Sequence, residues 1–297
     1  MIVIASKPGQ LANLLFVFGH FIAAAREHDL SIVNPAFDEY LEYFETTQGA
    51  FVARYPLRTG WSKGNRTTRR LLYQLAYYFA RVVVRGRLKL PFVKAVTLDW
   101  EDELQLDGPE FVKLAQRNKL TLAQGWLFRA NSSFAAHGEA VRHYFRPVAN
   151  IQNNVDGLIK QARAGHDLLV GVHIRQGDYR TFQEGRFFYQ TEQYVQLIKR
   201  LEEYFQGKKV RFLICSNVKQ DGQQFAAFDF TFGTNHFVED MYAFAECDYL
   251  VGPPSTYTMW ASFYGRTPLF MVDVIDREIN FTDSMFAAEP PLHDAKA

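Results

Sequence analysis

Residues 168–179 read Leu168-Leu169-Val170-Gly171-Val172-His173-Ile174-Arg175-Gln176-Gly177-Asp178-Tyr179, an apolar run that ends in polar residues. Such a run is typical of a strand buried on both faces of a parallel sheet, and its polar end is a turn signal. Because side chains alternate along a strand, His173 and Arg175 lie on the same face, with Gly171 beneath them. Ligands of open α/β sheets bind where the strands end, so we predict a ligand site at Arg175.

The charge of Arg175 allows two interpretations. A buried guanidinium without a partner is costly, so a partner is expected. One candidate is internal, an ion pair with Asp178 three residues further on. The other is an external anion, because the planar fork of an Arg side chain matches phosphate oxygens in pairs. The spacing alone leaves both open.

The second half of the chain alternates between strand and helix patterns. We predict strands at 168–175, 210–215, 249–251 and 269–272, and helices at 155–164, 191–205, about 239–247 and 255–264. This alternation indicates a parallel sheet with helices on both faces. The first half opens in the same way, with a strand at 2–5, a loop at 7–10 and a helix from 11 to about 27. We place a domain boundary near residue 150, which gives domains 1–150 and 151–297.

Composition restricts the class of protein. The 297 residues are 48% hydrophobic and 22% charged, with a formal net charge of +1, so we expect a globular protein with an ample core and no whole-chain attraction to nucleic acid. The two cysteines, Cys215 and Cys247, lie in apolar patterns that favour buried thiols, and no metal-ligand spacing is evident. We find neither a signal-peptide pattern nor an apolar run of about 20 residues. We therefore expect a cytoplasmic protein.

One segment departs from this even balance of charge. Residues 51–98 contain eleven Lys or Arg and no Asp or Glu. Within them, the apolar and aromatic residues 71–84 stand between basic residues, namely Arg69, Arg70, Arg85, Arg87 and Lys89. The segment could lie on an anionic membrane, as a peripheral contact at its inner face. It could instead form a basic groove for an anionic acceptor, or a domain helix with a solvated basic face.

A second motif, Gly252-Pro253-Pro254-Ser255-Thr256-Tyr257-Thr258-Met259-Trp260, follows a predicted strand and opens a predicted helix. Ser255 is a natural N-cap for that helix. The free backbone N–H groups of a first helical turn, together with the hydroxyls of Ser255 and Thr256, attract anions. The motif therefore predicts either a plain helix cap or an anion site.

Three segments carry a resemblance to a known family. Residues 173–179 resemble the H-x-R-x-G-D-Y signature of the α-1,2-fucosyltransferases, glycosyltransferase family 11, whose superfamily includes α-1,6- and protein O-fucosyltransferases. Residues 254–260 are similar to the family motif N-S-S/T-F-S-W-W, and residues 9–16 to its opening segment G-G-L-G-N-Q-x-F. The chain departs from the family at Gln176, where a second Arg is usual, and at Asn217, which stands in place of an acidic residue.

The resemblance implies a GT-B fold, with two Rossmann-like domains that face a cleft, in a protein of bacterial type. It implies inverting, metal-independent transfer of L-fucose from the donor GDP-fucose to a sugar hydroxyl, galactose O2, in the synthesis of glycans or surface polysaccharides. No further cofactor is implied. Gln176 and Asn217 keep two alternatives open: a related transferase that uses another nucleotide sugar, and a non-catalytic protein that binds a nucleotide or sugar.

The resemblance also implies roles for individual residues. The catalytic candidates are Arg175, Asp178 and His173, and the donor-binding candidates are Arg175, Ser255, Thr256, Asn217, Asp240 and Asn13. Arg175 would bind the pyrophosphate and Asn13 would face the cleft. Asp178 would orient Arg175, although Asp178 and Glu184 are both candidate bases. For the other residues we keep simpler interpretations beside these: a packing role for His173, and for Asp240 a carboxylate in the first turn of a helix.

Overall fold

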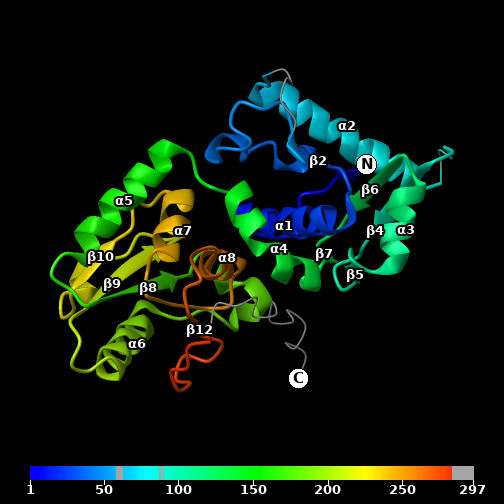
Figure 1. The fold of residues 1–297 in the computed structure, drawn as a ribbon. Helices are drawn as coiled ribbons and strands as arrows, with labels where there is room; N and C mark the ends of the chain where they lie inside the picture. Colours follow the sequence, from blue (N-terminus) through cyan, green and yellow to red (C-terminus); the bar gives the residue numbers. More distant parts are fainter. Residues whose placement is uncertain (58–62, 87, 89, 283–297) are drawn as a thin grey trace. The chain divides into compact units, whose positions relative to one another are not determined.

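The computed structural model describes residues 1–57, 63–86, 88 and 90–282 (Figure 1). These residues divide into two compact units, the first from Met1 to Val148 and the second from Ala149 to residue 282. Each unit has its own five-stranded sheet with helices packed on it.

The sheet of the first unit has the order β3-β2-β1-β6-β4. Its strands are β1 (Ile2–Ile4), β2 (Ile32–Asn34), β3 (Ala53–Tyr55), β4 (Val93–Thr97) and β6 (Leu120–Gln124). Neighbouring strands are parallel except for β3, which is antiparallel to β2. A parallel pair, β5 (Glu103–Gln105) and β7 (Leu127–Arg129), forms a separate small sheet. The helices are α1 (Leu11–His28), α2 (Arg66–Val84), α3 (Pro109–Arg117) and α4 (Asn131–Tyr144), and 3-10 turns cover Pro35–Phe37 and Leu41–Tyr43.

Helix α1 forms the centre of the first unit. Its residues from Leu11 to Ala25 are buried almost without interruption, as its apolar sequence predicts. It starts after Gly9, whose φ of +102° suits glycine. It ends at Asp29, which adopts the left-handed conformation of a C-cap.

The sheet of the second unit is parallel throughout its described strands, in the order β10-β9-β8-β11-β12. These strands are β8 (Leu168–Ile174), β9 (Val210–Ser216), β10 (Phe230–Phe232), β11 (Tyr249–Gly252) and β12 (Leu269–Met271). Its helices are α5 (Ala149–Arg163), α6 (Thr191–Tyr204), α7 (Phe237–Ala245) and α8 (Thr256–Gly265), with 3-10 turns at Asp178–Arg180, Phe182–Gly185 and Gly222–Phe225. Helix α6 lies on the opposite side of the sheet from α5 and α7 (Figure 1). The predicted strand–helix alternation is confirmed.

The two faces of β8 are packed as the alternation of its side chains predicts. Val170, Val172 and Ile174 lie in the core with Tyr194 and Leu197 of α6. On the other face Gly171 leaves no room for a side chain, because a Cβ there would lie 2.6 Å from Leu250 Cδ2 and 2.7 Å from Phe244 Cδ1. Helix α7 can therefore approach β8 closely beneath His173.

Two further predictions concern cysteines and membranes. Cys215 and Cys247 are both buried free thiols, as expected. Among the helices that the structure describes, none has the length and apolar character needed to cross a bilayer.

Candidate functional site

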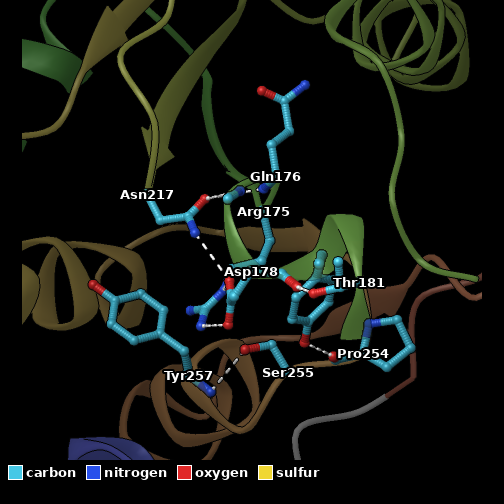
Figure 2. Close-up of polar contacts among 10 residues, drawn as sticks. Arg175, Gln176, Asp178, Thr181, Asn217, Pro254, Ser255 and Tyr257 are labelled. Carbon is cyan, nitrogen blue, oxygen red and sulfur yellow. Dashed lines mark hydrogen bonds and ion pairs between the residues drawn. The ribbon is translucent and has the colours of Figure 1, made fainter. Parts of the chain in front are cut away.

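Arg175 follows the last residue of β8, and Asp178 holds its guanidinium. Arg175 Nε donates to Asp178 Oδ1 at 2.8 Å and Nη2 donates to Oδ2 at 2.7 Å (Figure 2). The predicted internal partner is thus present. The pair uses two of the five N–H groups of the guanidinium, and in the described part of the chain Nη1 has no hydrogen-bond partner. Asp178 therefore fixes the plane of the guanidinium and leaves its Nη1 edge for an anion.

The pair keeps both groups charged. Burial alone would lower the pKa of Arg175, but the hydrogen bonds and charge of Asp178 raise that pKa above its ordinary value. The hydrogen bonds from Arg175 hold the pKa of Asp178 below its ordinary value, despite partial burial. A carboxylate with a lowered pKa and both oxygens bonded to a cation is a weak proton acceptor, so this geometry favours the orienting role of Asp178.

Asn217, which follows β9, holds the turn after Arg175. Its Oδ1 accepts from the backbone N–H of Gln176 at 2.9 Å and of Gly177 at 3.4 Å, and its Nδ2 donates to Asp178 Oδ1 at 3.1 Å. Figure 2 shows Asn217 beside Asp178 in this arrangement. The side chain of this donor-binding candidate is thus largely used to shape the turn around Asp178.

Gln176 turns away from Arg175 and Asp178 (Figure 2). Its Nε2 donates to Tyr189 O at 3.0 Å and to Thr191 Oγ1 at 3.3 Å, and its Oε1 accepts from Gln220 Nε2 at 3.0 Å. An Arg at this position could not accept the bond from Gln220, because a guanidinium only donates. Gln176 therefore ties together the chain segments that follow β8 and β9, a role that the sequence did not indicate.

The same network holds the start of α6. Thr191 is the first residue of this helix, at the predicted start. Its hydroxyl accepts from Gln176 and donates to Gln220 Oε1 at 3.1 Å. Gln190 precedes it, and the Gln190 backbone N–H donates to Gln193 Oε1 at 2.8 Å.

Tyr179, which we did not single out from the sequence, joins the two motifs. Its hydroxyl donates a short hydrogen bond to the backbone oxygen of Pro254 (Figure 2). The Arg175 guanidinium carbon lies 5.3 Å from the centre of the Tyr179 ring, a cation–π contact. The signal was present, since Tyr179 ends the first motif, but a partner 75 residues away cannot be read from one sequence.

Ser255 caps α8, as predicted. Its Oγ accepts from the backbone N–H of Tyr257 at 3.2 Å (Figure 2), and its backbone oxygen accepts from Met259 at 3.1 Å. Thr256 is the first helical residue. Because β11 pairs with β8 in parallel, the N-terminus of α8 and Arg175 both follow the carboxyl ends of adjacent strands. The positive end of the helix and a guanidinium thus stand at the same sheet edge.

His173 is enclosed by aromatic rings. Its side chain is almost fully buried, and its ring centre lies 5.1 Å from that of Tyr257 and 6.0 Å from that of Phe244. Its Nδ1 has no hydrogen-bond partner in the described part of the chain. Burial, and then the charge of Arg175, lower the pKa of His173 to about 3. The imidazole is therefore neutral near pH 7, and its surroundings fit the packing interpretation.

This pKa predicts a pH-dependent stability. Between pH 6.5 and about 3 the unfolded state binds a proton at His173 that the folded state does not, so the free energy of unfolding falls as the pH falls. From about pH 7.5 to about pH 5 His173 should account for a loss of about 2 kcal/mol. We expect urea unfolding to show this loss in the wild type and not in His173→Phe, so that the free energy of unfolding falls by about 2 kcal/mol more in the wild type over this pH range. Parallel slopes would show that the folded state can protonate His173.

Asp240, in the first turn of α7, is a buried carboxylate that holds the chain segment after β10. Its Oδ1 accepts from Thr234 N at 2.7 Å and Thr234 Oγ1 at 3.3 Å. Burial raises its pKa to about 6. The charges of Asp240 and Arg175 both act on the phenol of Tyr257, whose pKa burial raises. Asp240 belongs to α7, which packs against α8, and it has no described bond to Arg175 or Asp178.

The remaining candidates lie outside this bonded cluster. Asn13 belongs to the first unit, where it lies in the first turn of α1 and donates from Nδ2 to Pro8 O at 2.9 Å. Glu184 is exposed in the 3-10 turn Phe182–Gly185, with a φ of 59°. A search of the described residues finds no group of His, Cys, Asp and Glu side chains placed to hold a metal ion.

Comparisons with known proteins bear on the fold. No protein-family model matches the chain, and no curated protein matches it. Solved structures do: a mutant of Arabidopsis thaliana FUT1 in complex with GDP has a TM-score of 0.59 at 12% identity, covering 91% of this chain and 69% of that one. Fucosyltransferase NodZ from Bradyrhizobium has a TM-score of 0.57 at 14% identity, covering 95% and 98%. POFUT1 in its apo form has a TM-score of 0.54 at 12% identity, covering 91% and 97%.

This chain has the GT-B fold. The predicted fold class, α/β with two Rossmann-like units, is confirmed by the two sheets and by these structural neighbours. TM-scores of 0.59 and 0.57 at identities of 12% and 14% establish a shared fold alone. They do not by themselves carry over the activity of the neighbours, which has to be argued from the site.

Proposed function

We propose that the protein is an inverting fucosyltransferase that moves L-fucose from GDP-fucose to a sugar hydroxyl. The observation that carries this proposal is the Arg175–Asp178 pair at the end of β8, beside the capped N-terminus of α8. This edge of a parallel sheet is the usual ligand site of such folds. Solved structures with the same fold include NodZ soaked with GDP-fucose and a FUT1 mutant with GDP.

The proposed chemistry follows from where charge develops. As the glycosidic bond of a nucleotide sugar breaks, negative charge grows on the departing diphosphate. The Nη1 edge of Arg175 and the first turn of α8 would hold that charge, with the hydroxyls of Ser255 and Thr256 as further contacts. In this scheme Asp178 positions Arg175 through both carboxylate oxygens, and the base that accepts the proton of the acceptor hydroxyl is not assigned.

The acceptor is the finer part of the proposal. The resemblance of residues 173–179 to the α-1,2-fucosyltransferases supports galactose O2 as the acceptor atom. Incubation with GDP-fucose and a β-galactoside should give a product whose NMR spectrum shows an α-1,2 linkage, with the anomeric configuration of the donor inverted. Transfer to another hydroxyl would contradict the proposed acceptor atom and would still support GDP-fucose as the donor. Faster turnover of another nucleotide sugar would correct the donor.

We expect turnover to be independent of a divalent cation. A guanidinium and a helix N-terminus can supply the positive charge that a metal ion supplies elsewhere. The rate of GDP release should therefore be the same, within error, with and without excess EDTA. A rate that disappears with EDTA and returns on addition of Mn²⁺ would contradict this part of the scheme.

Ser255→Ala should weaken GDP binding by about 0.5–2 kcal/mol, the cost of losing a cap or one hydrogen bond. The matched control is Asn65→Ala, which removes the Asn65 cap of α2 in the first unit, where the side chain accepts from Thr68 N at 2.9 Å. Calorimetric titration with GDP and a melting curve separate the two effects. If both variants lose thermal stability and neither loses GDP affinity, Ser255 is only a cap.

A further inference from the structure

Helix α2 has two apolar faces, and only one of them packs against the protein. On the inner face Ala76, Phe79 and Ala80 pack with Val3 and Leu122 of the sheet. The outer face carries a second apolar row with nothing described over it. Its members are Leu71, Leu75, Tyr78 and Val82, which are exposed by 55%, 61%, 62% and 38%.

The spacing of this row makes it a single stripe. Positions 71, 75, 78 and 82 recur at i, i+4, i+7 and i+11, which at 3.6 residues per turn fall on one narrow strip of a helix. Further exposed apolar residues are Val84, the last residue of α2, and Leu88, Leu90 and Phe92, which follow the helix. Phe92 adjoins β4, an edge strand of the sheet. We call the stripe of Leu71, Leu75, Tyr78 and Val82 the outer face of α2. An exposed apolar surface of this extent is typical of an interaction site.

The charged residues that α2 and its flanks place beside the stripe are basic, and apart from Glu42 the one carboxylate described as acting on them is Glu39, whose pKa Arg66 and Arg70 help to lower. Arg70, Arg81 and Arg85 fall on one side of it at 100° per residue, with Arg70 and Arg85 exposed and Arg81 half-buried over the Tyr77 ring. Arg69 is different, because it is buried and paired with Glu42 at 2.6 Å. No Asp or Glu occurs in residues 51–98. Arg87 and Lys89, which also belong to this basic run, lie outside the described residues.

We propose that the outer face of α2 docks on an anionic lipid bilayer. Leu and Tyr side chains in a stripe beside Arg residues form the pattern of a helix that lies in the membrane interface. Over its 19 residues such a helix offers about 28 Å of contact parallel to the surface. The ring of Tyr78 suits the headgroup level, and Arg side chains reach lipid phosphates while their stems cover apolar surface.

Charge disfavours a second copy of the chain as the occupant. A symmetric contact through this face would bring the same basic residues together, and residues 51–98 contain no carboxylate to pair with them. An anionic bilayer complements both the apolar stripe and the basic residues. The inference concerns the first unit alone and does not depend on fucose transfer.

The test is co-sedimentation of the full chain with vesicles. Vesicles of phosphatidylcholine mixed with phosphatidylglycerol should bind the protein at about 0.1 M salt. Binding should weaken at about 1 M, where the Debye length falls from about 10 Å to about 3 Å, and vesicles of pure phosphatidylcholine should bind less. Each basic residue near an anionic surface contributes roughly fivefold to partitioning. The double variant R70Q/R85Q should therefore bind about 25-fold more weakly.

Matched variants distinguish binding through the outer face of α2 from binding that depends only on the overall charge or apolar surface of the protein. K113Q/R117Q removes two exposed basic residues from α3 in the same unit, and V274D places a charge at an exposed apolar residue of the second unit. Both should bind like the wild type, whereas L75D and Y78D should lose most binding and keep the wild-type melting temperature, because both side chains are exposed.

Three results would overturn the proposal. One is no binding to anionic vesicles at low salt. Another is L75D and Y78D variants that bind as well as the wild type. The last is self-association of the wild type without lipid, measured by sedimentation velocity, together with a monomeric L75D variant. The outer face of α2 would then join two copies of the chain. GDP-fucose turnover is measured separately, in buffer without lipid or detergent. A protein that turns over GDP-fucose and does not bind vesicles would overturn only the docking proposal. A protein that binds vesicles and does not turn over GDP-fucose would overturn only the proposed transferase activity.

Discussion

Arg175→Lys should fold normally and lose about 10²–10³ in kcat, the typical effect of removing one preorganised donor to developing charge. Lys keeps the positive charge, so part of the ion pair with Asp178 survives. What Lys cannot reproduce is a planar fork that bonds Asp178 through Nε and Nη2 and still presents Nη1. Because the charge to be held grows as the bond breaks, the loss should fall on kcat more than on KM.

The matched control is Arg163→Lys. Arg163 forms a similar two-point pair in the same unit, with Nη1 donating to Asp248 Oδ2 at 2.8 Å and Nη2 donating to Oδ1 at 3.1 Å. That pair also anchors Leu169 through its backbone N–H. We expect R163K to lower the melting temperature and to leave kcat near the wild-type value. If R175K behaves in the same way as R163K, Arg175 is structural.

Asp178→Asn should lower kcat by about 10–10², the range for losing one or two hydrogen bonds to a charged group. Asn offers one acceptor where Asp178 offers two, and it removes the charge that fixes Arg175. If Asp178 positions Arg175, the acid limb of the pH–rate profile should remain in D178N, because another group is the base. Loss of that limb, with a rate independent of pH, would make Asp178 the base instead. Asp248→Asn serves as the structural control.

The sequence predicted the part of the site that depends on local pattern. The alternation of apolar residues in 168–175 placed His173 on the face opposite the α6 core, where it lies against Phe244 and Tyr257. Ser255 preceded an apolar helix and is its N-cap. Asp178 stood within reach of Arg175 and pairs with it. Each of these relations spans a few residues, so strand and helix periodicity suffices to find it.

The contacts and helix boundaries that the sequence did not predict depend on distant residues or on an unusual helix cap. Gln176 bonds Gln220, 44 residues away, and Tyr179 bonds Pro254, 75 residues away. Such contacts are set by strand order, which one sequence does not reveal. Helix α7 begins at Phe237, two residues before the predicted start, because His236 caps it through Nδ1, which accepts from Glu239 N at 3.4 Å. His is not among the preferred N-cap residues, so the sequence pattern places the start of this helix at the acidic residues of its first turn.

The structure also bears on two departures from the motifs of the family that the sequence resembles. Gln176 replaces the usual second Arg, and its amide holds the segments that flank Arg175 through bonds that an Arg could not all make. Asn217 replaces an acidic residue, and its amide supports the turn at Gly177 and the carboxylate of Asp178. Both side chains thus leave Arg175 and Asp178 supported by hydrogen bonds of the neighbouring segments.

The central claim is tested most directly by GDP release from GDP-fucose, measured with and without a galactoside acceptor. The proposed fucosyltransferase should release GDP many times faster when the acceptor is present, and R175K should lose that acceptor-dependent release while its melting curve stays unchanged. A protein that binds GDP in a calorimeter and yet releases none from GDP-fucose with any galactoside would contradict the account, and would instead be a nucleotide-binding protein with this fold.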